Sequence, residues 1–298
     1  GADSEIPAPA TAFIKRPREK PFLMVTSFVN PHNICEWSRG EELKDGAVGP
    51  PPSPDDCPPA VENLAPPEDE ADGMLLMRRS YQNNALFPVG KFDQNKWRQY
   101  RWAYFRMIEK VDAHLATILA ALRESGQIDR TVIVFTSDHG DAQGAHGWNQ
   151  KTIFYDNVAR VPLVIVGPGA TQGGLSDRLV NTGIDIFPTL CEFADIPVPA
   201  AAPGRSLNAS TRNPKASDPR KYVVSESKMV QGGPVDGQTP VLSGRMVRSM
   251  RFKYCAYTIG EQRESLFDLD HDPGEMVNLA GSAEYRQDLE RHRRYLAE

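Results

Sequence analysis

Three near-continuous apolar runs constrain the fold more than any other feature of this 298-residue chain. They cover residues 21–29, 131–137 and 161–166, and such runs are typical of strands that are buried on both faces. Between the first two, residues 95–125 carry apolar side chains at three- and four-residue steps, and residues 184–195 repeat that helical pattern. This order of strands and helices predicts an α/β fold in which a mostly parallel sheet is flanked by helices.

The composition changes between residues 196 and 219, where Pro, Ala, Ser and Asn predominate. Short β-like segments follow, and a charged helix is expected to begin near residue 283. We therefore predict a large α/β domain over residues 1–215 and a small α+β subdomain over residues 216–298. The subdomain is expected to consist of an antiparallel sheet with one helix.

Charge and composition exclude several classes of partner. The net charge of -5 is spread along the chain, whereas nucleic-acid binding needs a basic surface, so we expect no nucleic-acid partner. No apolar run approaches the roughly 20 residues that cross a bilayer, and the first residues show no signal-peptide pattern. We therefore expect no membrane span.

Cys35 and Cys57 bracket a proline-rich loop and form either a disulfide or two buried thiols.

Polar residues follow the apolar runs at the points where the predicted strands end. His32 follows the first run, and Asp138 and His139 follow the second. In open α/β sheets, ligands bind at the carboxyl ends of the strands. A carboxylate oxygen and a neutral imidazole nitrogen can both bind a divalent cation. Lys151, thirteen residues after Asp138, could neutralise an anion beside that cation, and His146 could be a further polar contact. The spacing predicts a metal and anion site, and the alternative is a strand end capped by turn residues.

Several ordered motifs along the chain closely resemble the sulfatase family of the alkaline phosphatase superfamily. The central motif is Phe135–Asp141, and the other motifs lie before and after it: Ser27–His32, Gly144–Gly147, Lys151, Tyr155–Asp156, Arg160–Leu163, Asp185–Leu190 and Leu266–Leu279. The resemblance extends from about residue 21 to the end of the chain. It implies an alkaline-phosphatase-like mixed sheet, mostly parallel and flanked by helices.

The resemblance also implies a role for each site residue. Asp138 and His139 match the second pair of ligands to the family's cation, for which we expect Ca²⁺, with Mg²⁺ or Mn²⁺ as alternatives. His32 and Lys151 match residues that bind sulfate oxygens and assist the leaving group. His146 has no firm family role, so a substrate contact and a structural hydrogen bond both stay open.

Family members also carry an N-terminal region that this sequence does not match. That region holds a first Asp-Asp metal pair, a further Lys and His, and a Cys/Ser-x-Pro-x-Arg motif whose Cys or Ser becomes formylglycine. Cys57 stands in Asp56-Cys57-Pro58-Pro59 without the arginine, so we do not expect it to be the nucleophile. We expect residues 1–215 to be the C-terminal portion of the catalytic domain. The chain would then depend on a missing N-terminal segment of the same protein for its formylglycine and be inactive by itself.

The resemblance implies a sulfuric ester hydrolase whose nucleophile is a metal-bound formylglycine hydrate. The expected substrate is a small-molecule or glycan sulfate ester, either a sulfated sugar or an aryl sulfate. A periplasmic or secreted location is favoured on family grounds. Two alternatives are a phosphonate or phosphodiester hydrolase of the same superfamily and a non-catalytic anion- or glycan-binding homologue. The sequence leaves the oligomeric state open.

Overall fold

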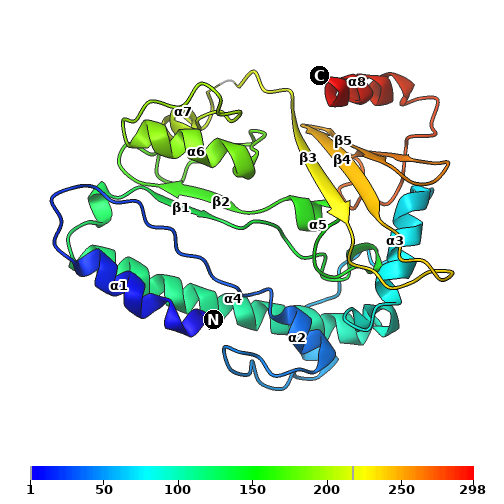
Figure 1. The fold of residues 1–298 in the computed structure, drawn as a ribbon, viewed down its shortest axis with the longest axis horizontal. Helices are drawn as coiled ribbons and strands as arrows, with labels where there is room; N and C mark the ends of the chain where they lie inside the picture. Colours follow the sequence, from blue (N-terminus) through cyan, green and yellow to red (C-terminus); the bar gives the residue numbers. More distant parts are fainter. Residues whose placement is uncertain (1, 217) are drawn as a thin grey trace. The chain divides into compact units, whose positions relative to one another are not determined.

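The computed structural model describes residues 2–216 and 218–298, which form two compact units (Figure 1). The first unit runs from the N-terminus to Val61 and includes Ala85–Thr131, and the second consists of Glu62–Asn84 and Val132–Glu298. These units cross the domain division predicted at residues 215 and 216, which stays a prediction. No helix among the described residues is both long and apolar enough to cross a membrane.

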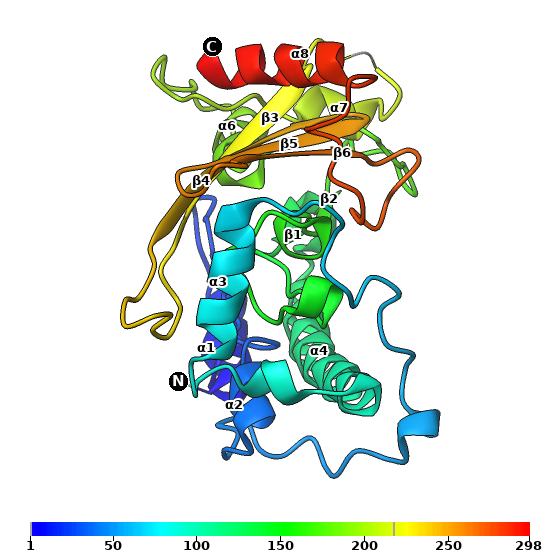
Figure 2. The ribbon, with the colours of Figure 1, turned by 90° about the vertical axis from the view of Figure 1, so that its right-hand side faces the viewer.

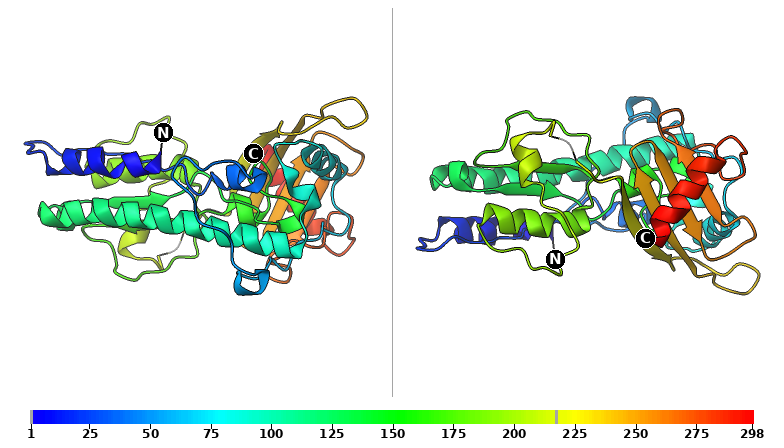
Figure 3. Two further views of the ribbon diagram at one scale, coloured as in Figure 1. Left: turned by 90° about the horizontal axis from the view of Figure 1, so that it is seen from below. Right: turned by 90° about the horizontal axis from the view of Figure 1, so that it is seen from above.

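The first unit is built on the long helix α4 (Gln94–Glu124), which confirms the helix predicted over residues 95–125. Its first turn is capped by Asp93, whose carboxylate accepts a hydrogen bond from Lys96 N at 2.7 Å. Helix α1 (Pro7–Lys15) lies along α4 (Figures 1 and 3). The other elements of this unit are short: η1 (Asp3–Glu5), α2 (Ile34–Arg39), η2 (Pro54–Asp56), η3 (Pro88–Lys91) and η4 (Ile128–Arg130).

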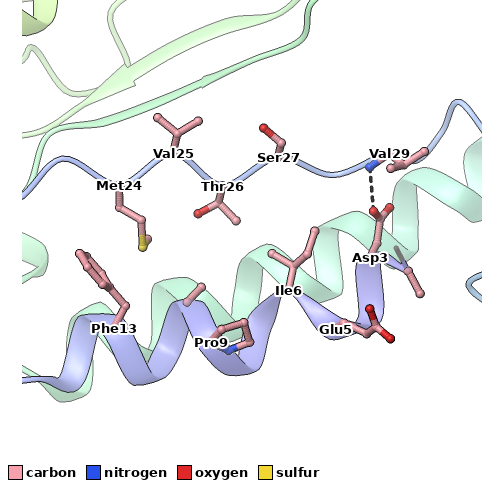
Figure 4. Close-up of a pocket in the computed structure, with 12 residues that line it drawn as sticks. Asp3, Glu5, Ile6, Pro9, Phe13, Met24, Val25, Thr26, Ser27 and Val29 are labelled. Atoms are coloured by element: carbon pink, nitrogen blue, oxygen red, sulfur yellow. Dashed lines mark hydrogen bonds between the residues drawn. The ribbon is translucent and has the colours of Figure 1, made fainter.

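Residues 21–29 contain no strand, so the prediction of a strand buried on both faces is wrong. The segment is extended, but no strand in the described part of this unit pairs with it. Phe22 packs on Phe13 with ring centroids 5.3 Å apart, whereas Leu23 and Val25 are 72% and 81% exposed. Figure 4 shows Val25 directed away from α1, whereas Met24 points toward it. An apolar run favours an extended backbone, but a strand also needs a neighbour for its N–H and C=O groups.

The second unit contains the strands β1 (Ile133–Thr136) and β2 (Leu163–Val166), which confirm two of the predicted strands. They pair antiparallel, so the described residues do not contain the predicted parallel arrangement. The pair is not buried on both faces either, because Phe135, Val164 and Val166 are 41%, 50% and 53% exposed. The helices around it include α6 (Thr182–Phe193), predicted over residues 184–195, and the short elements η5 (Ala145–Gly147), α5 (Asp156–Ala159) and α7 (Asn208–Arg212).

A four-stranded antiparallel sheet in the order β3-β4-β5-β6 belongs to the same unit. Its strands are β3 (Tyr222–Met229), β4 (Leu242–Ser249), β5 (Phe252–Tyr257) and β6 (Glu264–Asp268). Helix α8 (Arg286–Ala297) covers one face of this sheet (Figure 2). The core between them consists of Val247, Phe252, Tyr254, Leu266 and Leu289. This confirms the predicted small sheet with one helix and, together with β1, β2 and α6, the mixed α/β class.

The other face of the sheet carries Lys253 and Tyr257, because successive side chains of β5 point to opposite faces. The Tyr257 ring lies 6.3 Å from the ring of Phe154, so this face packs on the segment that follows Lys151. Helix α3 (Asp72–Gln82) lies beside the sheet (Figure 2). All four cysteines, Cys35, Cys57, Cys191 and Cys255, are buried free thiols, which answers the question of a Cys35–Cys57 disulfide.

Candidate metal and anion site

The Asp138–His139 pair follows β1 directly. The Asp138 side chain is 85% exposed and the His139 side chain 28%. His139 Nδ1 lies 2.7 Å from Gly140 O, and since a carbonyl oxygen only accepts hydrogen bonds, Nδ1 carries the proton. In the neutral imidazole the other ring nitrogen, Nε2, presents its lone pair, and it lies 3.5 Å from Asp138 Oδ2.

This pair fits part of a divalent-cation site. A carboxylate oxygen and an imidazole lone pair that face each other repel unless a cation or a proton lies between them. Ligand bonds of about 2.0–2.4 Å would let one cation contact both atoms. In residues 2–216 and 218–298, no group of three or more His, Cys, Asp or Glu side chains is arranged to hold a metal ion. Asp138 and His139 can therefore supply two ligands, and a complete site needs further ones.

Gly140 makes the turn after this pair possible. Its N–H donates to Val158 O at 2.8 Å. A Cβ atom at this position would lie 2.1 Å from Asn157 O, so only glycine allows the backbone to approach so closely.

Asp141 connects the metal-binding pair to Lys151. Its carboxylate accepts hydrogen bonds from Gln143 N at 2.8 Å and from Gln150 N at 3.0 Å. The backbone adds a further bond, from Ala142 N to Gln150 O at 3.0 Å. These contacts hold the residue before Lys151 against the residues that follow His139.

Lys151 provides a cation that can meet an anion. Its side chain is half-buried, and within the described part of the chain its ammonium has no hydrogen-bond or ion-pair partner. An ammonium group in this state can donate to the oxygens of a bound anion. The loop therefore combines a pair of side chains that can bind a cation with a side chain that can bind an anion.

His146 lies in the same loop but is fully buried, at 0% exposure. Its backbone N–H donates to the backbone carbonyl of Asn63 at 2.6 Å, and its ring centroid lies 3.8 Å from that of Tyr155. Burial lowers the pKa of His146 to about 4, so the ring is neutral near pH 7. This placement favours the structural alternative over the substrate contact.

His32, the remaining predicted site residue, belongs to the first unit. It is exposed between the extended segment and α2, and its N–H donates to Val29 O at 2.9 Å. The structure thus joins Asp138, His139 and Lys151 through one loop of the second unit, and it places His32 in the other unit.

Sequence reasoning missed a buried ionic group that contacts the segment after Lys151. Lys253 in β5 is 1% exposed, and its Nζ donates to Glu275 Oε1 at 2.7 Å and also pairs with Asp156. The available signal was a lysine inside the apolar strand segment 252–257. A buried ammonium requires a carboxylate partner, so this position called for one.

Comparison with known proteins identifies the family. A family model described as Sulfatase matches residues 2–196. The chain belongs to the sulfatase family. A second model, described as N-sulphoglucosamine sulphohydrolase, C-terminal, matches residues 144–298. The family that the motifs predicted is therefore confirmed, and both matches include Lys151.

Individual members and neighbours support this sulfatase assignment. A Delta 4,5-hexuronate-2-O-sulfatase of Bacteroides thetaiotaomicron is 32% identical over 294 residues, which cover 96% of this chain and 58% of that protein. The solved structure of a 2-O GAG sulfatase has a TM-score of 0.83 at 30% identity, over 99% of this chain and 62% of that chain. The structure of a phosphonate monoester hydrolase of Agrobacterium radiobacter has a TM-score of 0.72 at 25% identity, over 100% and 61%. The chain thus spans somewhat more than half the length of the sulfatases it matches.

Proposed function

We propose that this protein hydrolyses sulfate esters, and that its substrate is a sulfated sugar or an aryl sulfate. The observation that carries the proposal is the loop from Asp138 to Lys151. It contains the Asp138–His139 pair, and the Asp141 carboxylate accepts a hydrogen bond from the backbone directly before Lys151, whose ammonium group has no partner among the described residues. A sulfated sugar is the first choice because the hexuronate sulfatase named above is similar over nearly the whole chain.

The residues of this chain would have distinct tasks in the reaction. Lys151 would bind sulfuryl oxygens and offset the negative charge that builds on them in the transition state. His32 would donate a proton to the leaving oxygen, as an imidazole can do near neutral pH. A divalent cation held by Asp138 and His139, Ca²⁺ first and Mg²⁺ or Mn²⁺ as alternatives, would polarise a sulfate oxygen and position the nucleophile.

We further propose that the nucleophile is a formylglycine from polypeptide outside these 298 residues. No Cys/Ser-x-Pro-x-Arg sequence occurs within them, so these residues do not include the motif from which formylglycine is formed. The exposed apolar side chains of one extended segment and of strands β1 and β2 support this proposal. In the first unit Leu23 and Val25 are exposed, and in the second unit Phe135 and Val166 are exposed. Apolar strand faces of this kind normally lie under a neighbouring segment.

A phosphonate or phosphodiester hydrolase is the second candidate. The phosphonate monoester hydrolase structure favours it, since its TM-score of 0.72 extends over the whole chain. A lysine that binds sulfate oxygens can also bind phosphonate oxygens. A non-catalytic anion-binding homologue is the third candidate, and it would bind calcium and anion without turnover.

The substrate class is tested with the complete gene product. We expect it to release sulfate from a sulfated hexuronate or an aryl sulfate at a higher kcat/KM than it releases alcohol from a phosphonate monoester. A higher kcat/KM for the phosphonate would move the assignment to the second candidate. Calcium binding without turnover of either ester would support the third. Mass spectrometry of the same material would detect the formylglycine.

A further inference from the structure

The backbone on both sides of Lys151 has an unusual conformation. Gln150 has φ 62° and Thr152 has φ 82°, and the left-handed region is costly for a β-branched residue such as threonine. A conformation of this kind persists only where surrounding groups impose it. The question is which groups hold the residues that flank Lys151.

Hydrogen bonds on both sides fix the two flanking residues. Before Lys151, the Asp141 carboxylate accepts from Gln150 N at 3.0 Å. After it, Ser227 Oγ of strand β3 donates to Thr152 O at 3.0 Å. The C-terminal sheet therefore contacts the backbone directly next to Lys151.

A buried ionic group holds the backbone three to five residues after Lys151. Lys253 Nζ donates to Phe154 O at 2.9 Å and to Glu275 Oε1 at 2.7 Å, and it pairs with Asp156. The second oxygen, Glu275 Oε2, accepts from Asp156 N at 2.6 Å. Burial alone would lower the pKa of Lys253, but Glu275 and Asp156 outweigh burial and raise it, so the ammonium stays charged.

The residue between these anchors, Tyr155, is fixed as well. Its ring packs on His146, and its hydroxyl donates to the buried carboxylate of Glu70, which also pairs with Arg78. The segment from residue 150 to residue 156 is thus held at nearly every second residue.

The tail motif over residues 266–279 supports Glu275 in this arrangement. Asp272 Oδ2 accepts from Met276 N at 2.7 Å and from Val277 N at 2.9 Å. Glu275 itself has φ 57° and is 1% exposed. Asn278 Oδ1 accepts from Leu266 N at 2.9 Å and ties the motif to strand β6. The proposed reaction assigns no task to this motif, although it is part of the resemblance to the sulfatases.

We propose that Ser227, Lys253 and Glu275 are positioning residues for Lys151. They hold the Gln150–Asp156 backbone from the C-terminal sheet, so that the Lys151 ammonium is presented to the substrate anion. This inference rests on the proposed function of Lys151. If these contacts served stability alone, their loss would leave the chemistry of Lys151 unaffected once the protein is folded.

Ser227→Ala tests the proposal with the smallest disturbance, because it removes one hydrogen bond and leaves the buried ions intact. Ser225→Ala is the matched control, since Ser225 is an exposed serine two residues earlier on the same face of β3. Ser227→Thr keeps the hydroxyl group and should behave as wild type. Glu275→Gln is the second test, because it weakens the hold on Asp156 while Lys253 keeps Asp156 as a partner.

Two measurements on the complete gene product decide the outcome. Hydrogen exchange of peptides that contain residues 150–156 should be about threefold faster or more in Ser227→Ala and Glu275→Gln, and unchanged in Ser225→Ala. Initial rates should show kcat reduced about three- to tenfold in Ser227→Ala, as for one lost hydrogen bond. In the Lys151→Ala background, Ser227→Ala should have no further effect.

An additive loss in the Lys151→Ala background would overturn the proposal, and so would unchanged hydrogen exchange in both test variants. Failure of the proposed function has a different signature. If only a phosphonate monoester is turned over, the same cycle is run on that ester. If neither ester is turned over, the same pair of substitutions is compared by calorimetry of inorganic sulfate binding. Ser227→Ala should then weaken sulfate binding only while Lys151 is present, and a loss of affinity that persists in the Lys151→Ala background contradicts the inference.

Discussion

The burial of His146 predicts a specific dependence of stability on pH. The unfolded chain takes up a proton on this histidine below about pH 6.5, whereas in the folded protein its pKa is lowered to about 4. Between these values the unfolded state binds more protons, so stability is fully present above pH 6.5 and is lost as the pH falls toward 4. From this difference, the loss amounts to about 2 kcal/mol at pH 5 and about 3 kcal/mol at pH 4.

The assay is urea denaturation of wild type and His146→Phe at several pH values from 7.5 to 4. The variant loses the contact between the His146 ring and the Asn63 side-chain amide, so its absolute stability falls, but it should lack the part of the pH dependence that His146 contributes. His114→Gln is the control, since His114 is only partly buried and pairs with no carboxylate among the described residues. If wild type and His146→Phe lose stability in parallel between pH 6.5 and 4, the folded protein does not keep His146 neutral and the reasoning fails.

Three further predictions concern the metal site and two ion pairs. Asp138→Ala should weaken Ca²⁺ binding by at least about tenfold in calorimetry, because it removes a ligand; unchanged affinity would place the ion elsewhere. Arg220→Met should lower the free energy of unfolding by about 3–5 kcal/mol, because it leaves the Asp185 carboxylate buried without its partner; a loss below 1 kcal/mol in urea would contradict this. A hydrogen bond from Arg251 lowers the pKa of Asp268 to about 2, so the stability from this pair is present above about pH 4 and is lost as the pH falls from 4 toward 2. Arg251→Gln should remove about 1 kcal/mol of that acid-sensitive stability, since Arg251 is 44% exposed, and an identical acid-denaturation curve would argue against it.

The elements that could be predicted are those whose pattern is local. Helix α4 has 31 residues of helical periodicity, and strands β1 and β2 coincide with apolar runs. The direction of pairing could not be predicted, because a buried parallel strand and an apolar antiparallel strand have the same composition. Residues 21–29 show the same limit, since an apolar run does not reveal whether another strand lies beside it.

The candidate site shows the same difference between local and distant information. Asp138, His139 and Lys151 lie within one loop, so their motifs and spacing identified them. The positioning residues could not be found in this way, because Lys253 lies 99 residues after Phe154, the residue whose carbonyl it contacts. Contacts of such long separation follow from the packing of the C-terminal sheet, which no periodicity in the loop predicts.

The Lys151 ammonium is proposed to stabilise the charge of a sulfuryl group, and this role is measured by the kcat/KM of Lys151→Ala on a sulfate ester. In the complete gene product we expect a loss of about 10²-fold or more, with the melting temperature and Ca²⁺ affinity unchanged. Lys228→Ala, an exposed lysine of β3, should retain full activity. A Lys151→Ala enzyme with wild-type kcat/KM would contradict the account and remove Lys151 from the site.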